Sequence, residues 1–226
     1  MARAFPIPVI MALLLAAAAA FAGAPGTVFI LSAPSGTGKT TLARRLLLEV
    51  PGLAQAVSTT TRAPRPGERE GVDYLFVDDT RFDAMLVQGA LLEWVEIYGR
   101  RYGLSREGMA RQLASGQDLL LDLDTAGART LRRKVPDTVS VFLLPPSARE
   151  LARRLRGRRT EDERRIALRL GQAGRECARY PEYDYLVVNG DLDQAFRELQ
   201  AIILASRARR QRREALAEKI LEGFRD

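Results

Sequence analysis

The sequence contains no histidine and only one cysteine, Cys177. The absence of histidine excludes histidine-based catalytic triads and histidine metal sites, so carboxylates, hydroxyls, lysine and arginine are left for any chemistry. A single cysteine cannot form an intramolecular disulfide, which is typical of a protein in a reducing compartment. Lysine is scarce too, because only Lys39, Lys134 and Lys219 stand among the 35 basic residues.

Arginine therefore supplies almost all of the formal net charge of +7. This bias is typical of a genome rich in G and C, and it also suits an anionic partner, because the planar guanidinium binds phosphate through two parallel hydrogen bonds. The remaining composition is 46% hydrophobic and 28% charged over 226 residues. Such a chain is long enough for one sizeable core with small inserted lobes.

An apolar run from Val9 to Ala22 follows Arg3 and ends in Ala20-Phe21-Ala22. It has three interpretations: a mis-called start or dispensable extension, a targeting or anchoring segment, or a packed helix. The first is favoured, because the motif downstream binds a nucleoside triphosphate, which is scarce outside the cytoplasm. We therefore interpret residues 1–25 as an apolar leader or mis-called start and predict a cytoplasmic protein, with the leader as contrary evidence.

Apolar strands alternate with helices along most of the chain, which predicts an α/β domain with a mostly parallel sheet flanked by helices. The polar stretch 58–71 is expected to be loop, and the short strands between 58 and 105 predict a lobe inserted over the mouth of the site. The predicted strands are 27–32, 72–77, 91–97, 118–122, 139–144 and 185–188. The predicted helices are 39–49, 81–87, 106–114, 147–180 with a break around Gly157, and the segment from Leu192 onward.

A glycine-rich loop, Ala33-Pro34-Ser35-Gly36-Thr37-Gly38-Lys39-Thr40, joins the first strand to the first helix. Its glycines let successive backbone N–H groups point at phosphate oxygens, and the following helix adds its positive end. In this motif Lys39 reaches the β- and γ-phosphates and the Thr40 hydroxyl binds Mg²⁺. Asp122, at the end of a later apolar strand, is the matching carboxylate for magnesium. The loop therefore predicts transfer of a phosphoryl group from a triphosphate.

A second phosphate site is predicted in the segment from Ser58 to Glu68, where Arg62 and Arg65 flank a proline among hydroxyl groups. Composition alone leaves this segment equally open to being a solvated basic turn. The wider pattern resembles guanylate kinases over roughly residues 27–222. The motifs that carry the resemblance are Ser-x-Thr-Thr-Arg-x-x-Arg with Gly-Glu after it, Gly71-x-Asp73-Tyr74-x-Phe76, Leu92-Glu93-Trp94, Gly99-x-x-Tyr102-Gly103, Leu121-Asp122-Leu123-Asp124, Arg154-Leu155-x-x-Arg158 and Val188-Asn189-x-Asp191-Leu192.

The resemblance implies a P-loop fold and ATP-dependent phosphorylation of GMP, and of dGMP, to GDP. It implies that the GMP phosphate is held by Arg62, Arg65, Tyr74 and Tyr102, and that guanine faces Ser58, Glu93 and Asp124. A carboxylate such as Glu93 accepts hydrogen bonds from guanine N1–H and N2–H₂, whereas adenine has no donor at N1. The ATP-binding residues implied are Ala33, Pro34, Ser35, Gly36, Thr37, Gly38, Lys39, Thr40 and Asn189, and the metal ligands are Thr40 and Asp122.

The arginine-rich stretch 153–169 is similar to the lid of this family, which closes over the triphosphate. Lys39, Arg158 and Arg169 are the catalytic candidates, because phosphoryl transfer is catalysed chiefly by positioning and cationic stabilisation. One departure concerns Leu104, which stands where the family has Ser or Thr beside the guanine. Ser105, one residue later, is the candidate replacement for that hydroxyl.

The expected organisation is one kinase domain, 26–206, followed by a basic helix, 207–226, that extends the helix starting at Leu192. The domain divides into a core (26–57, 116–150 and 181–206), a GMP-binding lobe (58–115) and a lid (151–180). The expected partners are ATP, GMP and Mg²⁺, with no nucleic acid or membrane partner, and monomer and homo-oligomer stay open. Two alternatives are a kinase for a sugar phosphate such as ribose 1,5-bisphosphate and a non-catalytic scaffold that binds phosphoproteins. The tail also admits a nucleic-acid or membrane-surface patch.

Overall fold

Five parallel strands form the central sheet, in the order β2-β7-β1-β8-β9. The structure, a computed structural model, describes residues 25–157 and 163–225, so residues 1–24 of the leader and Arg158 lie outside the described residues. β1 lies in the middle, with Phe29 opposite Leu120 of β7 and Val139 of β8. The strands are β1 (Val28–Ser32), β2 (Leu53–Gln55), β7 (Asp118–Asp122), β8 (Val139–Leu144) and β9 (Tyr185–Val188).

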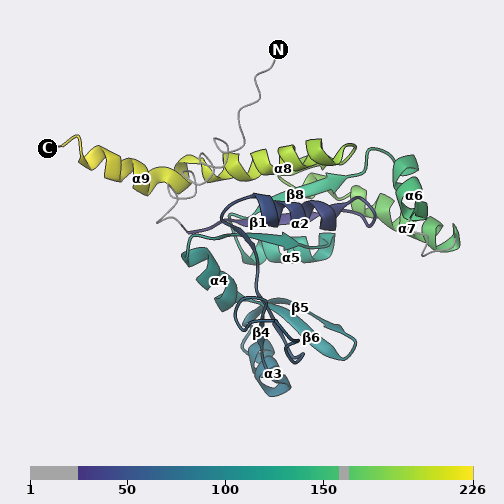
Figure 1. Ribbon diagram of the computed structural model, residues 1–226, viewed down its shortest axis with the longest axis horizontal. Helices are drawn as coiled ribbons and strands as arrows, with labels where there is room; N and C mark the ends of the chain where they lie inside the picture. The colour runs from purple at the N-terminus through teal and green to yellow at the C-terminus, as the bar shows by residue number, and fades with distance from the viewer. Residues whose placement is uncertain (1–24, 158–162, 226) are drawn as a thin grey trace, which may run out of the picture.

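Both faces of the central sheet are covered by helices, as a continuous apolar strand requires. Phe29 and Leu31 of β1 face a cluster that includes α2 (Lys39–Glu49) and α8 (Leu192–Arg207). Val28 and Ile30 face the opposite cluster, with α4 (Arg106–Ala114) and α5 (Thr125–Lys134). In Figure 1, α8 lies above the sheet and α5 lies below it. The predicted α/β class is confirmed.

A second sheet, in the order β4-β3-β6-β5, forms the lobe below the central sheet (Figure 1). β3 is parallel to β4 and antiparallel to β6, so this sheet is mixed. The prediction of loop over residues 58–71 is wrong for Ser58–Thr60, which form β3; β-branched threonines suit a strand, but their partners are distant in sequence. The other elements of the lobe are β4 (Tyr74–Phe76), α3 (Asp79–Val87), β5 (Leu91–Ile97) and β6 (Arg100–Ser105).

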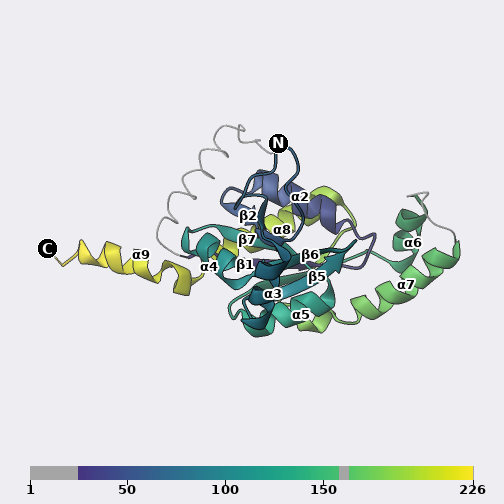
Figure 2. The ribbon, with the colours of Figure 1, turned by 90° about the horizontal axis from the view of Figure 1, so that it is seen from below.

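Two helices, α6 (Ala148–Gly157) and α7 (Glu163–Cys177), form an arm beside the central sheet. They pack on each other through a small apolar cluster that includes Leu155 and Ile166. Figure 2 shows the arm at one end of the molecule and α9 at the other. A 3₁₀ turn, η1 (Tyr180–Glu182), leads from the arm back to β9.

The C-terminal segment was predicted to extend α8 as one helix, and this prediction is wrong. α8 ends at Arg207, and a separate helix, α9 (Arg210–Glu222), begins after Arg209, whose ψ of 139° is not helical. α9 has no buried residue and reaches away from the core (Figure 1). No helix of the part of the chain that the structure describes is long and apolar enough to cross a membrane.

The break after α8 coincides with a buried ion pair between Arg207 and Asp118, whose side chains are 8% and 7% exposed. Arg207 Nε donates to Asp118 Oδ2 at 2.7 Å, and Arg207 Nη2 donates to the Pro51 carbonyl at 2.9 Å. The other carboxylate oxygen, Oδ1, accepts from the Thr27 N–H at 2.6 Å. The last turn of α8 is thereby held to the starts of β7 and β1.

Arg207→Met is expected to lower the free energy of unfolding by about 3 kcal/mol, because it leaves the Asp118 carboxylate buried without its counter-charge. Urea unfolding followed by circular dichroism measures the change. Arg210→Met is the matched control, since its pair with Glu214 is exposed and such pairs contribute little. Equal unfolding midpoints for the two variants would contradict the assigned role of the buried pair.

Candidate functional site

The glycine-rich loop lies between β1 and α2, and two of its glycines have a left-handed backbone, with φ of 91° at Gly36 and 99° at Gly38. A Cβ on Gly36 would stand 2.8 Å from the Leu155 side chain, and a Cβ on Gly38 would stand 2.5 Å from Asn189 Nδ2. Asn189 is buried and donates from Nδ2 to the Thr37 carbonyl at 2.6 Å. The loop is therefore shaped from outside by the arm and by the end of β9.

The loop encloses a cavity of about 310 Å³ at the N-terminus of α2. Every loop residue from Ala33 to Thr40 except the buried Thr37 lines it, and Asp124 and Glu176 line its rim. The backbone N–H groups of the first turn of α2 and the helix dipole favour an anion here. The predicted loop residues are thus brought together around one space, whereas Asn189 contacts the loop backbone from behind.

Lys39 lies at the carboxyl end of β7. Its Nζ forms an ion pair with Asp122 and donates to the Leu123 carbonyl at 3.1 Å. The Asp122 side chain is 37% exposed, and Thr40 is exposed at the start of α2. A carboxylate and a hydroxyl, open to solvent beside a phosphate site, are the hard oxygen donors that Mg²⁺ accepts while keeping phosphate and water oxygens as its other ligands. The donors present here fit that ion.

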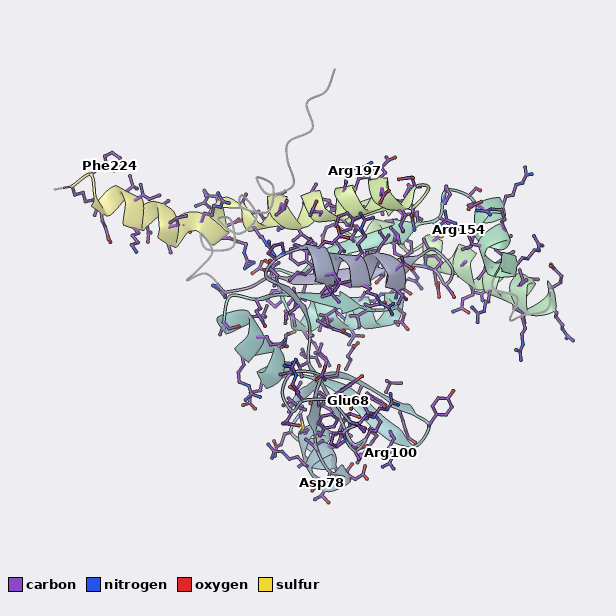
Figure 3. The ribbon with its side chains drawn as sticks, in the orientation of Figure 1. Glu68, Asp78, Arg100, Arg154, Arg197 and Phe224 are labelled. Carbon is purple, nitrogen blue, oxygen red and sulfur yellow. The ribbon has the colours of Figure 1, made fainter. Side chains whose placement is uncertain are left out.

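The arm contacts the loop through two arginines. Arg169 Nη1 of α7 donates to Ser35 Oγ at 3.1 Å. Arg154 of α6 donates to the Asn189 carbonyl at 2.9 Å, and Figure 3 shows it where the arm meets the core. Arg153 and Arg154 bond to Glu150 and lower the pKa of its carboxyl to about 2. Arg154 therefore connects the arm to the core, and Arg169 places a positive charge at the loop. Arg158 lies outside the described residues.

A larger cavity, of about 820 Å³, lies between the lobe and the central sheet, and we call it the lobe cavity. Ser58 and Glu93 both pair with Leu104 in the lobe sheet, so their side chains lie on one face of the sheet, on either side of Leu104. The cavity is lined by Ser58, Leu86, Leu91, Leu92, Glu93, Trp94, Val95, Tyr102, Gly103, Leu104, Asp122, Leu123, Asp124, Ala126, Gly127, Thr130 and Lys134. The three predicted guanine-facing residues are therefore brought together.

Glu93 is a half-buried carboxylate in the wall of this cavity. Its pKa is raised chiefly by burial and secondly by the negative charge of Asp124, while Lys134 lowers it. Asp124 accepts from the Gly127 N–H at 2.7 Å and so caps α5. A Cβ on Gly127 would stand 3.0 Å from Glu93 Oε2, so glycine gives the carboxylate its room.

The predicted phosphate clamp forms part of the lobe. Arg62 Nη2 donates to both carboxylate oxygens of Glu68, at 2.8 and 3.0 Å, and its guanidinium lies 5.3 Å from the centre of the Tyr74 ring. The Tyr74 and Tyr102 rings meet edge to face at 6.1 Å. Arg65 is exposed, and its backbone N–H donates to Glu68 at 2.7 Å. Figure 3 shows Glu68 within the lobe.

Glu68 was not among the predicted site residues, although it follows the clamp in the Pro-Gly-Glu sequence. Hydrogen bonds from Arg62 and from the Arg65 backbone lower the pKa of Glu68, and the bond to Glu68 is the main cause of the raised pKa of Arg62. The carboxylate therefore holds the clamp arginine in place. A glutamate that follows two arginines within six residues is the signal that could have identified it.

Ser105 does not replace the hydroxyl missing at Leu104, so this expectation is wrong. Ser105 is buried, and its Oγ accepts from the Gly108 N–H at 2.9 Å as the N-cap of α4. Alternation along β6 points neighbouring side chains to opposite faces of the sheet. Leu104 keeps the position between Ser58 and Glu93 and is 3% exposed.

The comparisons with known proteins agree with the motifs. Residues 26–206 match the family model described as guanylate kinase. The guanylate kinase of Bradyrhizobium diazoefficiens is 49% identical over 83% of this chain and 86% of its own length. That of Salmonella paratyphi A is 48% identical over 88% of this chain and 99% of its own length. The solved guanylate kinase of Anaplasma phagocytophilum superimposes with a TM-score of 0.58 at 32% identity, covering 84% of this chain and 90% of that one.

Proposed function

We propose roles in making GDP for the residues of this chain, which belongs to the guanylate kinase family. The chain is a kinase that transfers a phosphoryl group from ATP to GMP. The observation that carries the assignment of roles is the half-buried Glu93 carboxylate in the cavity beside the phosphate loop. We extend the activity to dGMP, because the implied contacts are to the base and the phosphate.

The donor nucleotide is held by the loop from Ala33 to Thr40. Its N–H groups bind the triphosphate, and Lys39 moves from Asp122 to the β- and γ-phosphates when the anion arrives. Asn189 does not line the loop cavity, and it supports the loop backbone by donating a hydrogen bond to the Thr37 carbonyl. The contact of Arg169 with Ser35 supports a role for this arginine at the transferring phosphoryl group, where charge is spread over the equatorial oxygens. Arg158 is proposed for the same role from the motif alone.

The acceptor nucleotide is held in the lobe cavity. Ser58, Glu93 and Asp124 face guanine, and Arg62, Arg65, Tyr74 and Tyr102 hold its phosphate. The pair of Arg62 with Glu68 supports this, because a carboxylate that fixes the guanidinium reduces the entropy lost on binding an anion. Closing the arm over the donor excludes water, which competes with GMP as acceptor.

Thr40 and Asp122 are the proposed ligands for Mg²⁺, which supplies charge neutralisation of the phosphate oxygens when bound. With Mg²⁺ bound, Asp122 would be held by the cation, and Lys39, which pairs with Asp122 in this structure, would be available to the phosphates. We further propose the division into core, lobe and lid at the boundaries expected from the sequence, with the arm as the lid. A cytoplasmic site of action fits this substrate pair, and cell fractionation with antibodies against the chain tests it.

A coupled assay with ATP and alternative acceptors tests the proposed function. GMP and dGMP are expected to be phosphorylated, whereas AMP and UMP should be at least about 10³-fold poorer in kcat/KM. Ribose 1,5-bisphosphate is the acceptor for the sugar-phosphate alternative. Turnover of that compound with none of GMP would contradict the proposal, and no turnover of any acceptor would favour the scaffold alternative.

Arg169→Ala is expected to lower kcat on the order of 10²-fold, because one cationic contact with the transferring group is lost. The KM for GMP should change little, since the residue lies at the loop and not in the lobe cavity. Arg175→Ala, six residues later on α7 and exposed, is the matched control with the same change in charge. Equal kcat values for the two variants would remove Arg169 from the catalytic residues.

A further inference from the structure

Lys134, the last residue of α5, lines the lobe cavity. Its Nζ donates to the Leu92 carbonyl at 2.5 Å, and Leu92 directly precedes Glu93 in β5. The ammonium group is therefore fixed on the same strand segment that carries the base-reading carboxylate. The motif assigns Lys134 no role, and the sequence showed it only as one of three lysines.

The cavity-facing side of α5 carries small side chains near its N-terminus and a lysine at its C-terminus. Ala126, Gly127, Thr130 and Lys134 all line the cavity, at a spacing that places them on one face of the helix. The small residues come first, where the Glu93 carboxylate approaches Gly127 closely. The lysine comes last, and its long side chain reaches β5 from the far end of the helix.

Glu93 faces mostly negative or titratable neighbours. The titratable residues that line the cavity with Glu93 are Asp122 at the end of β7, Asp124 at the N-cap of α5, Tyr102 of β6 and Lys134 of α5. Its neighbours Ser58 and Leu104 in the lobe sheet are uncharged. Lys134 is the one cation among the described residues that line the cavity. Burial and Asp124 raise the pKa of Glu93, and Lys134 opposes both.

Guanine recognition needs the charged form of this carboxylate. The ionised group accepts hydrogen bonds at both oxygens, so it can pair with N1–H and N2–H₂ together. A protonated carboxyl carries a donor on one oxygen, and that donor would meet a donor of the base. Any group that keeps Glu93 ionised therefore increases the fraction of enzyme able to bind guanine.

We propose that Lys134 is a positioning residue for guanine: its ammonium, anchored on the Leu92 carbonyl, keeps the Glu93 carboxylate in its ionised, doubly accepting form. The inference rests on the proposed function, because it assumes that Glu93 reads the base. It assigns a role in base specificity to a residue that acts on the nucleotide through Glu93 and does not itself contact the base.

The pH dependence of the KM for GMP in Lys134→Met tests the proposal. Loss of the cation raises the pKa of Glu93 further. As the pH falls, the variant therefore loses the ionised form of Glu93, which binds guanine, at a higher pH than the wild type does. We expect the KM for GMP to rise on the order of tenfold over wild type at the acid end of the activity range and to approach the wild-type value at alkaline pH. The change in KM should exceed the change in kcat.

Three further variants make the test specific. Lys134→Arg keeps the charge and should restore the wild-type pH profile, and Lys219→Met removes a lysine from α9 and should leave the profile unchanged. In Glu93→Gln the added Lys134→Met substitution should have no pH-dependent effect, because no carboxylate titrates there.

Two results would overturn the inference: a KM raised by the same factor at every pH, or a Lys134→Arg profile equal to that of Lys134→Met. The first is what loss of the Leu92 contact alone would produce. If wild-type enzyme does not use GMP, the proposed function fails instead, so the two failures are distinguishable.

Discussion

Lys39→Ala is expected to lower kcat for GDP formation by about 10³- to 10⁵-fold, because cationic stabilisation of the transferring phosphoryl group has effects of that size in related chemistry. The fold should persist. Within the described residues, Lys39 Nζ bonds to Asp122 and to the Leu123 carbonyl. The Asp122 side chain is 37% exposed, so water can solvate it after the change. A coupled assay and a thermal unfolding curve measure the two quantities on one preparation.

Lys219→Ala is the matched control for this variant, since it removes a lysine from the exposed helix α9. It should leave both kcat and the unfolding midpoint unchanged. If Lys39→Ala kept kcat within tenfold of wild type, the loop would not be the donor site that the proposal needs. If it unfolded the protein instead, the lysine would be a structural residue of the junction between β7 and α2.

Glu93→Gln is expected to reduce the preference for GMP over AMP, as a ratio of kcat/KM values, by about 10³- to 10⁴-fold. The amide keeps the size of the side chain but has one acceptor and one donor group, so it cannot accept from N1–H and N2–H₂ together. Most of the loss should appear in the KM for GMP. Parallel assays with GMP and AMP at one ATP concentration give the ratio.

Glu96→Gln is the control, because Glu96 lies three residues along β5, on the opposite face of the strand, and is exposed. Stability gives an independent check on Glu93. A carboxyl whose pKa is raised on folding contributes stability at low pH that is lost as the pH rises through the folded pKa. Glu93→Gln should therefore not lower the unfolding midpoint at neutral pH. An unchanged GMP-to-AMP ratio would remove Glu93 from base recognition.

The phosphate loop was predictable because the residues that specify it are close together in the sequence. A strand, a glycine-rich turn and a helix follow each other within residues 28–49, and the positive φ at Gly36 and Gly38 is what such a turn needs. Asp122 was predictable for a related reason, since carboxyl ends of parallel strands meet at one edge of the sheet. The strands and helices with long apolar patterns were placed correctly on the same grounds.

The lobe was less predictable. β3 is short and polar, and it pairs with β6, a strand distant in the sequence. β6 was also missed, although its other partner, β5, directly precedes it in the chain. α5 was missed although its polar and apolar residues segregate to opposite faces, because it is short and only Ala128 and Leu131 of its ten residues are buried. The residues proposed to read the base were found through the family motif and not through periodicity, and Glu68 was overlooked although it stands in that motif.

The amino-acid sequence by itself determined the phosphate loop, because the residues proposed to bind the triphosphate lie together in one loop and its flanking elements. Only the tertiary structure decided which groups surround Glu93, since Asp124, Gly127 and Lys134 meet β5 through the packing of α5 against the lobe. It also decided that α8 ends at a buried ion pair. The physical reason is that charge and burial depend on neighbours in space, and for Glu93 and Arg207 those neighbours are dozens of residues away in the chain.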